Sequence, residues 1–399
     1  MEAAGAAGEG ITDLLGPFGP VKGRRVLAPK ARIGGMSGPT AGSAVREGGA
    51  RTLAQVYRHF GEVVAETSPL YGRVAVALSE SGEALCAIEA APARNRHPTV
   101  ILAALHDLAL AGRAPALAAA YAAADGDAAA GAAIDALLRM TDSVVAIAAR
   151  RKTRANETGH CAVLYPAIAE AARRAGANAV GLIDVCCSAG LNLNVDRVGI
   201  TYGNGQSLGD LSSHVQQSCS IVGDRPVPTR AMPEVVARVG VDLDPVDVTD
   251  ADEARWLRAC LWPDQPERMA RLEAEMALAA RIPPLLLQGD AIEVVRDAFA
   301  RVPADALPLV TTTWALSRFT LESRLRFLHR LDEAALGRTV AWVSAEGVGV
   351  APTIPTLGDR RASGHSIIGV AVFDQSTLRA EAIGRCWSQG RFLAWLADS

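Results

Sequence analysis

The sequence has almost no net charge and few aromatic residues. Its 399 residues include 40 Lys and Arg against 43 Asp and Glu, which gives a net charge of −3 at pH 7, and only 5% are aromatic. A protein that binds nucleic acid through a strongly basic field needs a clear excess of positive charge. That class is excluded, apart from a local basic patch, so no nucleic-acid partner is expected.

Long apolar stretches are also missing. Nothing approaches the ~18 strongly apolar residues that a membrane span needs, because runs such as 144–149 are short. The first residues include Glu2 and Glu9 and lack the basic start and apolar stretch of a secretory signal peptide. We therefore expect a soluble cytoplasmic protein without a membrane partner.

The seven cysteines show no CxxC spacing. An odd number without that spacing argues against a disulfide framework and a structural zinc site, and fits a reducing compartment. A site made from His160, Cys161, His214 and Cys219 would need ligands from separate regions. No metal is expected.

Composition divides the chain into three regions. Residues 1–49 are rich in Gly, Ala and Pro, and their one apolar cluster, 11–15, is too small to offset the entropy of ordering. They are interpreted as a flexible tail. Residues 50–176 are interpreted as an all-helical subdomain, with further helices expected over 99–111, 132–150 and 157–175. Its first helix is indicated by apolar residues at spacings of three and four, which share one helix face: Leu53, Val56, Tyr57, Phe60, Val63 and Val64.

The third region, residues 177–399, alternates short β-branched or aliphatic runs with helical segments. Such alternation predicts a Rossmann-like α/β domain with a mostly parallel sheet covered on both faces. Strands are expected over 179–185, 239–243, 284–288, 307–312, 339–344 and 366–373. Helices are expected over 251–261, 266–281, 291–300 and 320–335. The long interval before the second strand predicts an inserted hairpin or lid at about 197–229.

Acidic residues stand at three successive strand ends, where the ligand of such a sheet lies. Asp184 opens a turn of small residues, 186–190, which would let a ligand approach backbone N–H groups. Asp242 is placed to accept both hydroxyls of a ribose, and Asp290 to accept the amine of a base. Asp290 also suits the N-cap of a helix that begins at Ala291.

These strand ends carry a resemblance to the class I S-adenosylmethionine-dependent methyltransferases from residue 178 to about 399, with the matching segments 188–192, 242–247 and 289–291. From Leu53 onward the chain also resembles an uncharacterised bacterial family, domain of unknown function 2332. That second resemblance rests additionally on 156–157 and on the segment Trp-Pro-Asp-Gln-Pro-Glu-Arg at 262–268.

The methyltransferase resemblance implies a seven-stranded sheet and transfer of a methyl group to a small or medium-sized acceptor. The residues that it places around S-adenosylmethionine are Asp184, Ser188, Gly190, Asn192, Asp242, Asp244, Asp290 and Ala291. The chain departs from the pattern because Cys186 and Ser188 replace the first two of three usual glycines. Residues 311–314 also lack the Asn/Asp-Pro-Pro-aromatic motif of the adenine-methylating enzymes.

The acceptor is expected beside the last parallel strands. Glu157 and Glu346 are the candidate catalytic carboxylates, because either could orient or deprotonate an acceptor. Asn156, Trp314 and His365 are the candidate substrate contacts.

Three other classes stay open. The turn around Ser188 is similar to a nucleophile elbow, with Asp359 or Asp290 orienting His365 as the base of a serine hydrolase. Against it, hydrolases of that fold place several strands before the elbow, where this chain is helical. A non-catalytic ligand-binding member of the same fold is the other alternative. A nicotinamide-dependent enzyme is the weakest hypothesis, because the sequence has no GxGxxG turn after the first strand.

Overall fold

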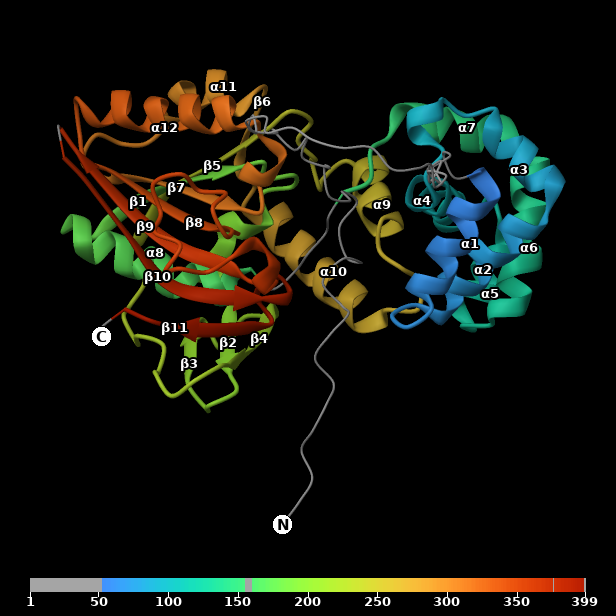
Figure 1. Ribbon diagram of the computed structural model, residues 1–399, viewed down its shortest axis with the longest axis horizontal. Coiled ribbons are helices and arrows are strands. Elements are labelled where there is room, and N and C mark those ends of the chain that lie inside the picture. The colour runs from blue at the N-terminus through green and yellow to red at the C-terminus, as the bar shows by residue number, and fades with distance from the viewer. Residues whose placement is uncertain (1–51, 155–159, 376, 398–399) are drawn as a thin grey trace, which may run out of the picture. The chain divides into compact units, whose positions relative to one another are not determined.

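A computed structural model describes residues 52–154, 160–375 and 377–397, and the chain divides into two compact units, residues 1–155 and 156–399 (Figure 1). The predicted tail, residues 1–49, lies outside the described residues. The unit boundary falls earlier in the chain than residue 176, which ended the predicted helical region.

The first unit is helical throughout its described part. Its helices are α1 (Leu53–Val64), α2 (Pro69–Glu80), α3 (Gly82–Glu89), α4 (Pro98–Leu110), α5 (Pro115–Ala122), α6 (Gly126–Arg139) and α7 (Thr141–Arg150), with a 3-10 turn, η1 (Ala93–Asn95). Side chains at the helix starts explain the boundaries: Thr52 forms a capping box with Gln55, and Ser68 and Ser81 accept backbone N–H groups. The predicted helix over 132–150 is broken, because Met140 leaves the helical conformation.

Within the described residues, no single helix has the length and apolar character to cross a membrane. Taken together, α4 and α5 have the length and apolar composition of a membrane span, but the pair is bent by 101°. Most residues of α4 are buried.

The second unit is built on one large, mostly parallel sheet of eleven strands. In chain order they are β1 (Ala179–Val185), β2 (Gly199–Tyr202), β3 (Ser207–Gly209), β4 (Gln216–Ile221), β5 (Glu234–Asp242), β6 (Leu285–Gln288), β7 (Leu307–Thr313), β8 (Val340–Gly347), β9 (Ser366–Asp374), β10 (Thr377–Trp387) and β11 (Phe392–Trp395). Their spatial order is β3-β2-β4-β11-β10-β9-β8-β7-β1-β5-β6. The mixed α/β architecture is as predicted.

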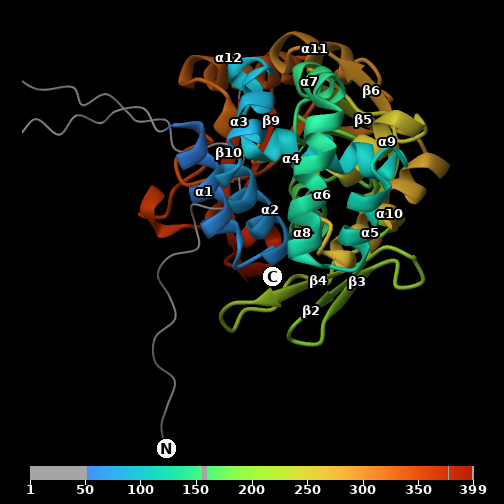
Figure 2. The ribbon, with the colours of Figure 1, turned by 90° about the vertical axis from the view of Figure 1, so that its right-hand side faces the viewer.

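The expected size of the sheet was wrong: it has eleven strands instead of seven. All six predicted strands are present as β1 and β5 to β9, and β6-β5-β1-β7-β8 run parallel. Past β8 the pairs β8–β9, β9–β10 and β10–β11 are antiparallel, and β11 then pairs in parallel with β4. The segment predicted as an inserted hairpin or lid forms β2, β3 and β4, which lie together in Figure 2. These strands extend the sheet because β4 pairs with β11.

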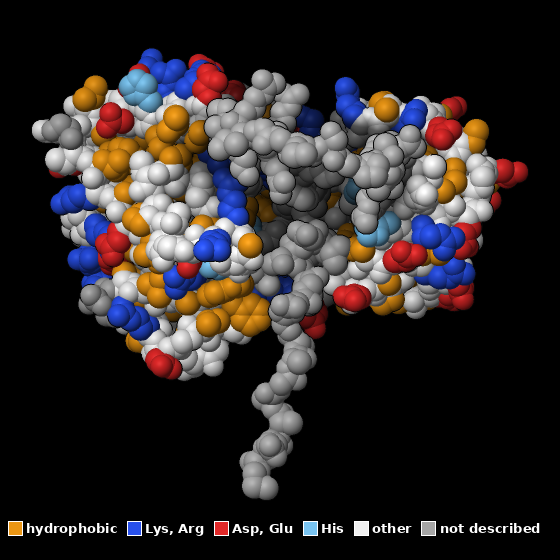
Figure 3. All heavy atoms as spheres, viewed as in Figure 1, with side chains coloured by type: hydrophobic (Ala, Val, Ile, Leu, Met, Phe, Trp, Pro, Cys, Tyr) orange, Lys and Arg blue, Asp and Glu red, His pale blue; other side chains and the backbone are white. Residues whose placement is uncertain are grey.

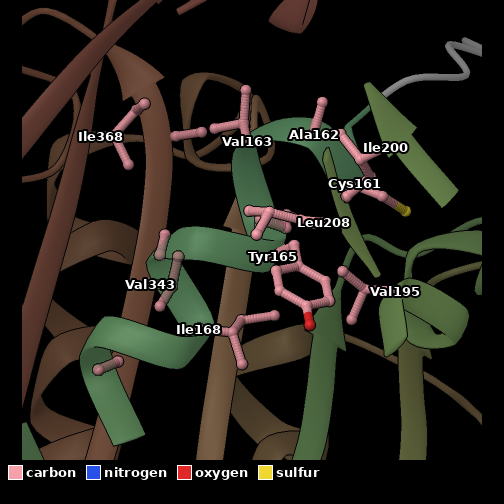
Figure 4. Packing of buried hydrophobic residues seen from close by; sticks show 14 of the residues in the cluster. Cys161, Ala162, Val163, Tyr165, Ile168, Val195, Ile200, Leu208, Val343 and Ile368 are labelled. Atoms are coloured by element: carbon pink, nitrogen blue, oxygen red, sulfur yellow. The ribbon is translucent and has the colours of Figure 1, made fainter. Parts of the chain in front are cut away.

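Helices cover both faces of this sheet. One face packs against α8 (Cys161–Ala175), in which every residue from Cys161 to Ala172 is buried (Figure 4). The other face packs against α11 (Ala291–Phe299) and α12 (Leu321–Ala335). Between β5 and β6 the chain forms α9 (Ala251–Ala259) and α10 (Pro266–Arg281), which pack on the end of the turn after β1. On the described part of the face in Figure 3, acidic and basic side chains are interspersed.

Substitution of Gly181 in β1 tests how tightly the sheet packs against the residues that cover it. A Cβ there would lie 2.4 Å from Val302 Cγ1 and 2.6 Å from Val302 Cγ2. We expect Gly181→Ala to lower the free energy of unfolding by about 1–3 kcal/mol, the usual cost of overpacking a core, measured by denaturant unfolding. Gly337→Ala is the control, since its Cβ would meet nothing within 4 Å. Equal stability of the two variants would contradict the packing.

Candidate functional site

The candidate site lies where the strand order reverses. After β1 the chain builds β5 and β6 on one side, and then returns to build β7 and β8 on the other side of β1. In open α/β sheets a crevice forms at such a switch point, beyond the carboxyl ends of the strands, and ligands bind there. The turns after β1, β5 and β7 therefore define the site.

The turn after β1 repeats a left-handed backbone at every second residue. Cys186, Ser188 and Gly190 have φ of +59°, +53° and +66°. For an L-residue this conformation costs roughly 1–2 kcal/mol, and such strain concentrates at functional sites. Cys186 and Ser188 thus keep the backbone that glycines would adopt without strain.

Gly190 is required by space as well as by conformation. A Cβ at this position would lie 3.0 Å from Pro284 Cγ and 3.2 Å from Leu193 Cδ1. The residue leads directly into the short 3-10 helix η2 (Leu191–Arg197).

Asp242, at the end of β5, holds this turn in place. Its carboxylate accepts the backbone N–H of Ser188 at 2.9 Å and that of Asp244 at 3.0 Å. Asp244 itself is exposed. The end of β5 is thus tied to the turn after β1 by a charge-assisted hydrogen bond.

Asp290 is the N-cap of a helix, which is one of the two roles predicted for it from the sequence. Its carboxylate accepts the N–H of Ile292 at 2.9 Å and caps α11, while Ala291 is buried. These two residues shape the end of β6.

Asp184 is buried beside the crevice, with 1% of its surface exposed. Thr311 donates a hydrogen bond of 2.7 Å to its carboxylate, and the Asn192 amide nitrogen lies 3.5 Å from both Asp184 Oδ2 and Thr313 Oγ1. Burial raises the pKa of Asp184 to about 7. Asn192 therefore connects the ends of β1 and β7.

A second buried carboxylate lies at the end of β8. Glu346 is 1% exposed and accepts the N–H groups of Ala315 and Leu316, each at 3.0 Å. Burial raises its pKa to about 7. The carboxylate organises the turn after β7, in which Trp314 has a φ of +51°.

An aromatic pair lies next to that turn. The Trp314 indole donates to Ser366 Oγ at 2.9 Å, and its ring lies 4.7 Å from the His160 ring, centroid to centroid. Both His160 ring nitrogens are buried with no hydrogen-bond partner within the described part of the chain, and burial lowers the pKa of His160 to about 4. The imidazole is neutral at pH 7.

His160 was missed as a site residue in the sequence, where it was weighed only as a metal ligand. Its position just after the 156–157 segment was the available signal. Asn156 and Glu157 themselves lie outside the described residues. Where the chain is described, no three His, Cys, Asp or Glu side chains gather as a metal site.

His365 belongs to a different cluster. Its Nε2 lies 2.8 Å from Asp359 Oδ2, and Arg385 donates to the same carboxylate at 2.7 and 3.1 Å. Arg385 keeps the pKa of Asp359 below its usual range. Three strand spacings separate β1 from β9, ~14 Å across the sheet, so Ser188 and His365 are not brought together.

The two cysteines of the turn are protonated thiols at neutral pH. Burial raises the pKa of Cys186 to about 12 and that of Cys187 well above its usual range. Only the thiolate is strongly nucleophilic, so neither cysteine is an activated nucleophile.

A family model described as an uncharacterized protein conserved in bacteria (DUF2332) matches residues 54–395. The chain belongs to this family. No curated protein and no solved structure matches it. The family match spans both units, so the helical unit and the sheet occur together in the family.

The raised pKa of Glu346 makes stability depend on pH. Between pH 4.5 and about 7 the folded protein binds more protons at Glu346 than the unfolded chain does, so this carboxyl's contribution to stability is lost as pH rises. Glu346→Gln lacks that loss. We compare the melting temperatures of Glu346→Gln and wild type by differential scanning calorimetry. The difference, variant minus wild type, should rise by several degrees from pH 5 to pH 7.5.

Exposed Glu322 in α12 offers the matched control. Glu322→Gln should follow the wild type at each pH. A Glu346→Gln difference that stays constant over the same range would contradict the buried, protonated carboxyl.

Proposed function

We propose that the second unit binds S-adenosylmethionine in the crevice beyond β1 and β5 and transfers its methyl group to a small or medium-sized acceptor. The observation that carries the proposal is the turn after β1. Cys186, Ser188 and Gly190 occupy the three positions of the usual glycines, and all three have a left-handed backbone.

The strand order supports the proposed cofactor site. Numbered along the chain without the inserted strands, β6-β5-β1-β7-β8 is the order 3-2-1-4-5, which is that of doubly wound, Rossmann-like nucleotide-binding sheets. Asp242 stands at the end of the second strand in this order. Carboxylate oxygens accept several hydrogen bonds at once, so backbone N–H groups and ribose hydroxyls can share Asp242.

The reaction would be a direct displacement. When bound, the sulfonium supplies an activated methyl group: its carbon–sulfur bond breaks with the electron pair left on sulfur, while an acceptor lone pair forms the new bond to carbon. The chain aligns the acceptor and takes up its proton. Glu346, with a pKa of about 7, can hold that proton, and the rings of Trp314 and His160, tilted by 52° to each other, can form an aromatic wall for the acceptor. Glu157 stays a prediction for the same role.

A small-molecule acceptor is the only partner in this proposal, which involves neither nucleic acid nor membrane. The cytoplasmic location remains a prediction from the sequence. A non-catalytic ligand-binding protein would use the same turn and differ only in lacking methyl transfer.

One observation favours the serine hydrolase. Ser188 lies in a strained turn between a strand and a helix, and its Oγ is buried without a hydrogen-bond partner among the described residues. A hydrolase needs a histidine base next to that oxygen. His365 is bonded to Asp359 instead, three strands away, so the methyltransferase reading is preferred.

Asp242→Asn tests the cofactor site. Loss of the carboxylate should weaken binding of S-adenosylhomocysteine by about 1–3 kcal/mol, or roughly 5- to 150-fold, the range for hydrogen bonds to a charged group. Isothermal titration calorimetry measures the dissociation constant. Asp247→Asn is the control, because Asp247 is exposed in the same loop and its carboxylate accepts hydrogen bonds from the N–H and hydroxyl of nearby Thr249. An unchanged dissociation constant in folded Asp242→Asn would reject the site.

Ser188→Gly separates the two enzyme classes. In a methyltransferase the variant restores a glycine at a left-handed position, so cofactor binding should be kept or strengthened. In a hydrolase the nucleophile is lost, which commonly costs several orders of magnitude in rate. We expect no labelling of the wild type by a fluorophosphonate probe. Stoichiometric labelling that disappears in Ser188→Gly would establish the hydrolase instead.

A further inference from the structure

The second unit contains a cleft of about 520 Å³ away from the crevice. Strands β2 and β4 form one wall, the first half of α10 another, and the segment around η5 (Ser388–Gly390) and β11 the third. Strands β2, β4 and β11 lie together in Figure 1, as their pairing requires. None of the residues at the ends of β1, β5 or β7 lines it.

We infer that this cleft is a second ligand site, which binds a small organic anion carrying a hydroxyl group, either a hydroxycarboxylate or a phosphate ester. The inference is independent of the proposed function. It rests on the charge of the walls and on two buried polar atoms, in side chains that line the cleft, that have no partner among the described residues.

Positive charge dominates the walls. Arg268 and Arg271 lie three residues apart on α10 and therefore share a helix face, and Arg391 comes from the opposite wall. Glu267 is the one acidic residue among those that line the cleft. Guanidinium groups are well suited to carboxylate and phosphate because they donate several hydrogen bonds in a planar fork.

A carboxyl group stands behind this wall. Glu275 is 7% exposed, and burial raises its pKa to about 7. Near neutral pH it carries less than a full negative charge, so it only partly offsets Arg271. The walls keep a net positive charge.

Gln217 supplies the second observation. It lines the cleft, is only 4% exposed, and donates through Nε2 to Glu275 Oε1 at 3.0 Å. Its carbonyl oxygen is buried with no partner in the described structure, and the same is true of Arg271 Nε. Buried polar atoms are nearly always hydrogen-bonded. An anionic group at Arg271 and a hydroxyl donor at Gln217 would satisfy both atoms.

The cleft also accounts for a sequence segment that the proposed function does not use. Residues 262–268 precede and open α10, and place Glu267 and Arg268 at the cleft. Gln265 accepts a hydrogen bond of 2.7 Å from Arg268 Nη1 and so orients that guanidinium. The volume of about 520 Å³ falls within the usual ~300–1,000 Å³ of small-molecule sites.

Calorimetric titration of the full chain tests the site with defined probes. Citrate and tricarballylate differ by one hydroxyl and represent carboxylates, and glycerol 3-phosphate and propyl phosphate differ by their carbon-bound hydroxyls and represent phosphate esters. We expect citrate or glycerol 3-phosphate to bind more tightly than its partner without the hydroxyl. Arg271→Gln and Arg391→Gln should each weaken that binding roughly tenfold or more. Arg281→Gln, on the exposed end of α10, should not.

Gln217→Leu isolates the hydroxyl contact. The variant should bind both members of a probe pair equally, while keeping affinity for the anion. Because Arg391 is exposed, its variant tests the charge even if a buried substitution fails to fold. Absence of binding by all four probes at millimolar concentration, or binding that neither arginine variant weakens, would overturn the site.

Discussion

The hydrogen bond from the Ser188 N–H to the Asp242 carboxylate is the contact on which the site depends. It joins the end of β5 to a turn in which two residues with side chains, Cys186 and Ser188, have a left-handed backbone. That strain has to be offset by fixed partners. Asp242 supplies one on the β5 side, and the packing of Gly190 against Pro284 and Leu193 supplies another.

Two buried carboxyl groups fix the chain at further strand ends of the same sheet. Asp184 and Glu346, two strands apart at the ends of β1 and β8, both have pKa values raised to about 7 by burial. Asp184 accepts hydrogen bonds from Thr311 in β7 and from Asn192 in η2, and Glu346 accepts them from Ala315 and Leu316 in the turn after β7. The ends of β1 and β8 therefore each hold a buried carboxyl group that can change its protonation state near neutral pH.

Strands that lie in the middle of the sheet were predictable from the sequence. They are buried on both faces and read as continuous aliphatic runs, as in β1 and β7. Strands β2, β3 and β4 are short and polar on one side, and β10 has only a weak alternation of Leu378 and Ala380 with charged residues, so the sheet was underestimated. The tight turn was predictable from the small residues at 186–190, but the left-handed backbone at Cys186 and Ser188 was not predicted. The pairing of His160 with Trp314, and the cleft beside α10, depend on segments far apart in the chain, which no local pattern reveals.

Titration of the wild-type chain with S-adenosylmethionine, S-adenosylhomocysteine and NADH tests the central claim most directly, because all three ligands contain an adenosine group. The account expects the first two to bind in a one-to-one ratio and NADH to show no heat of binding. Binding of NADH alone, or of none of the three, would contradict it.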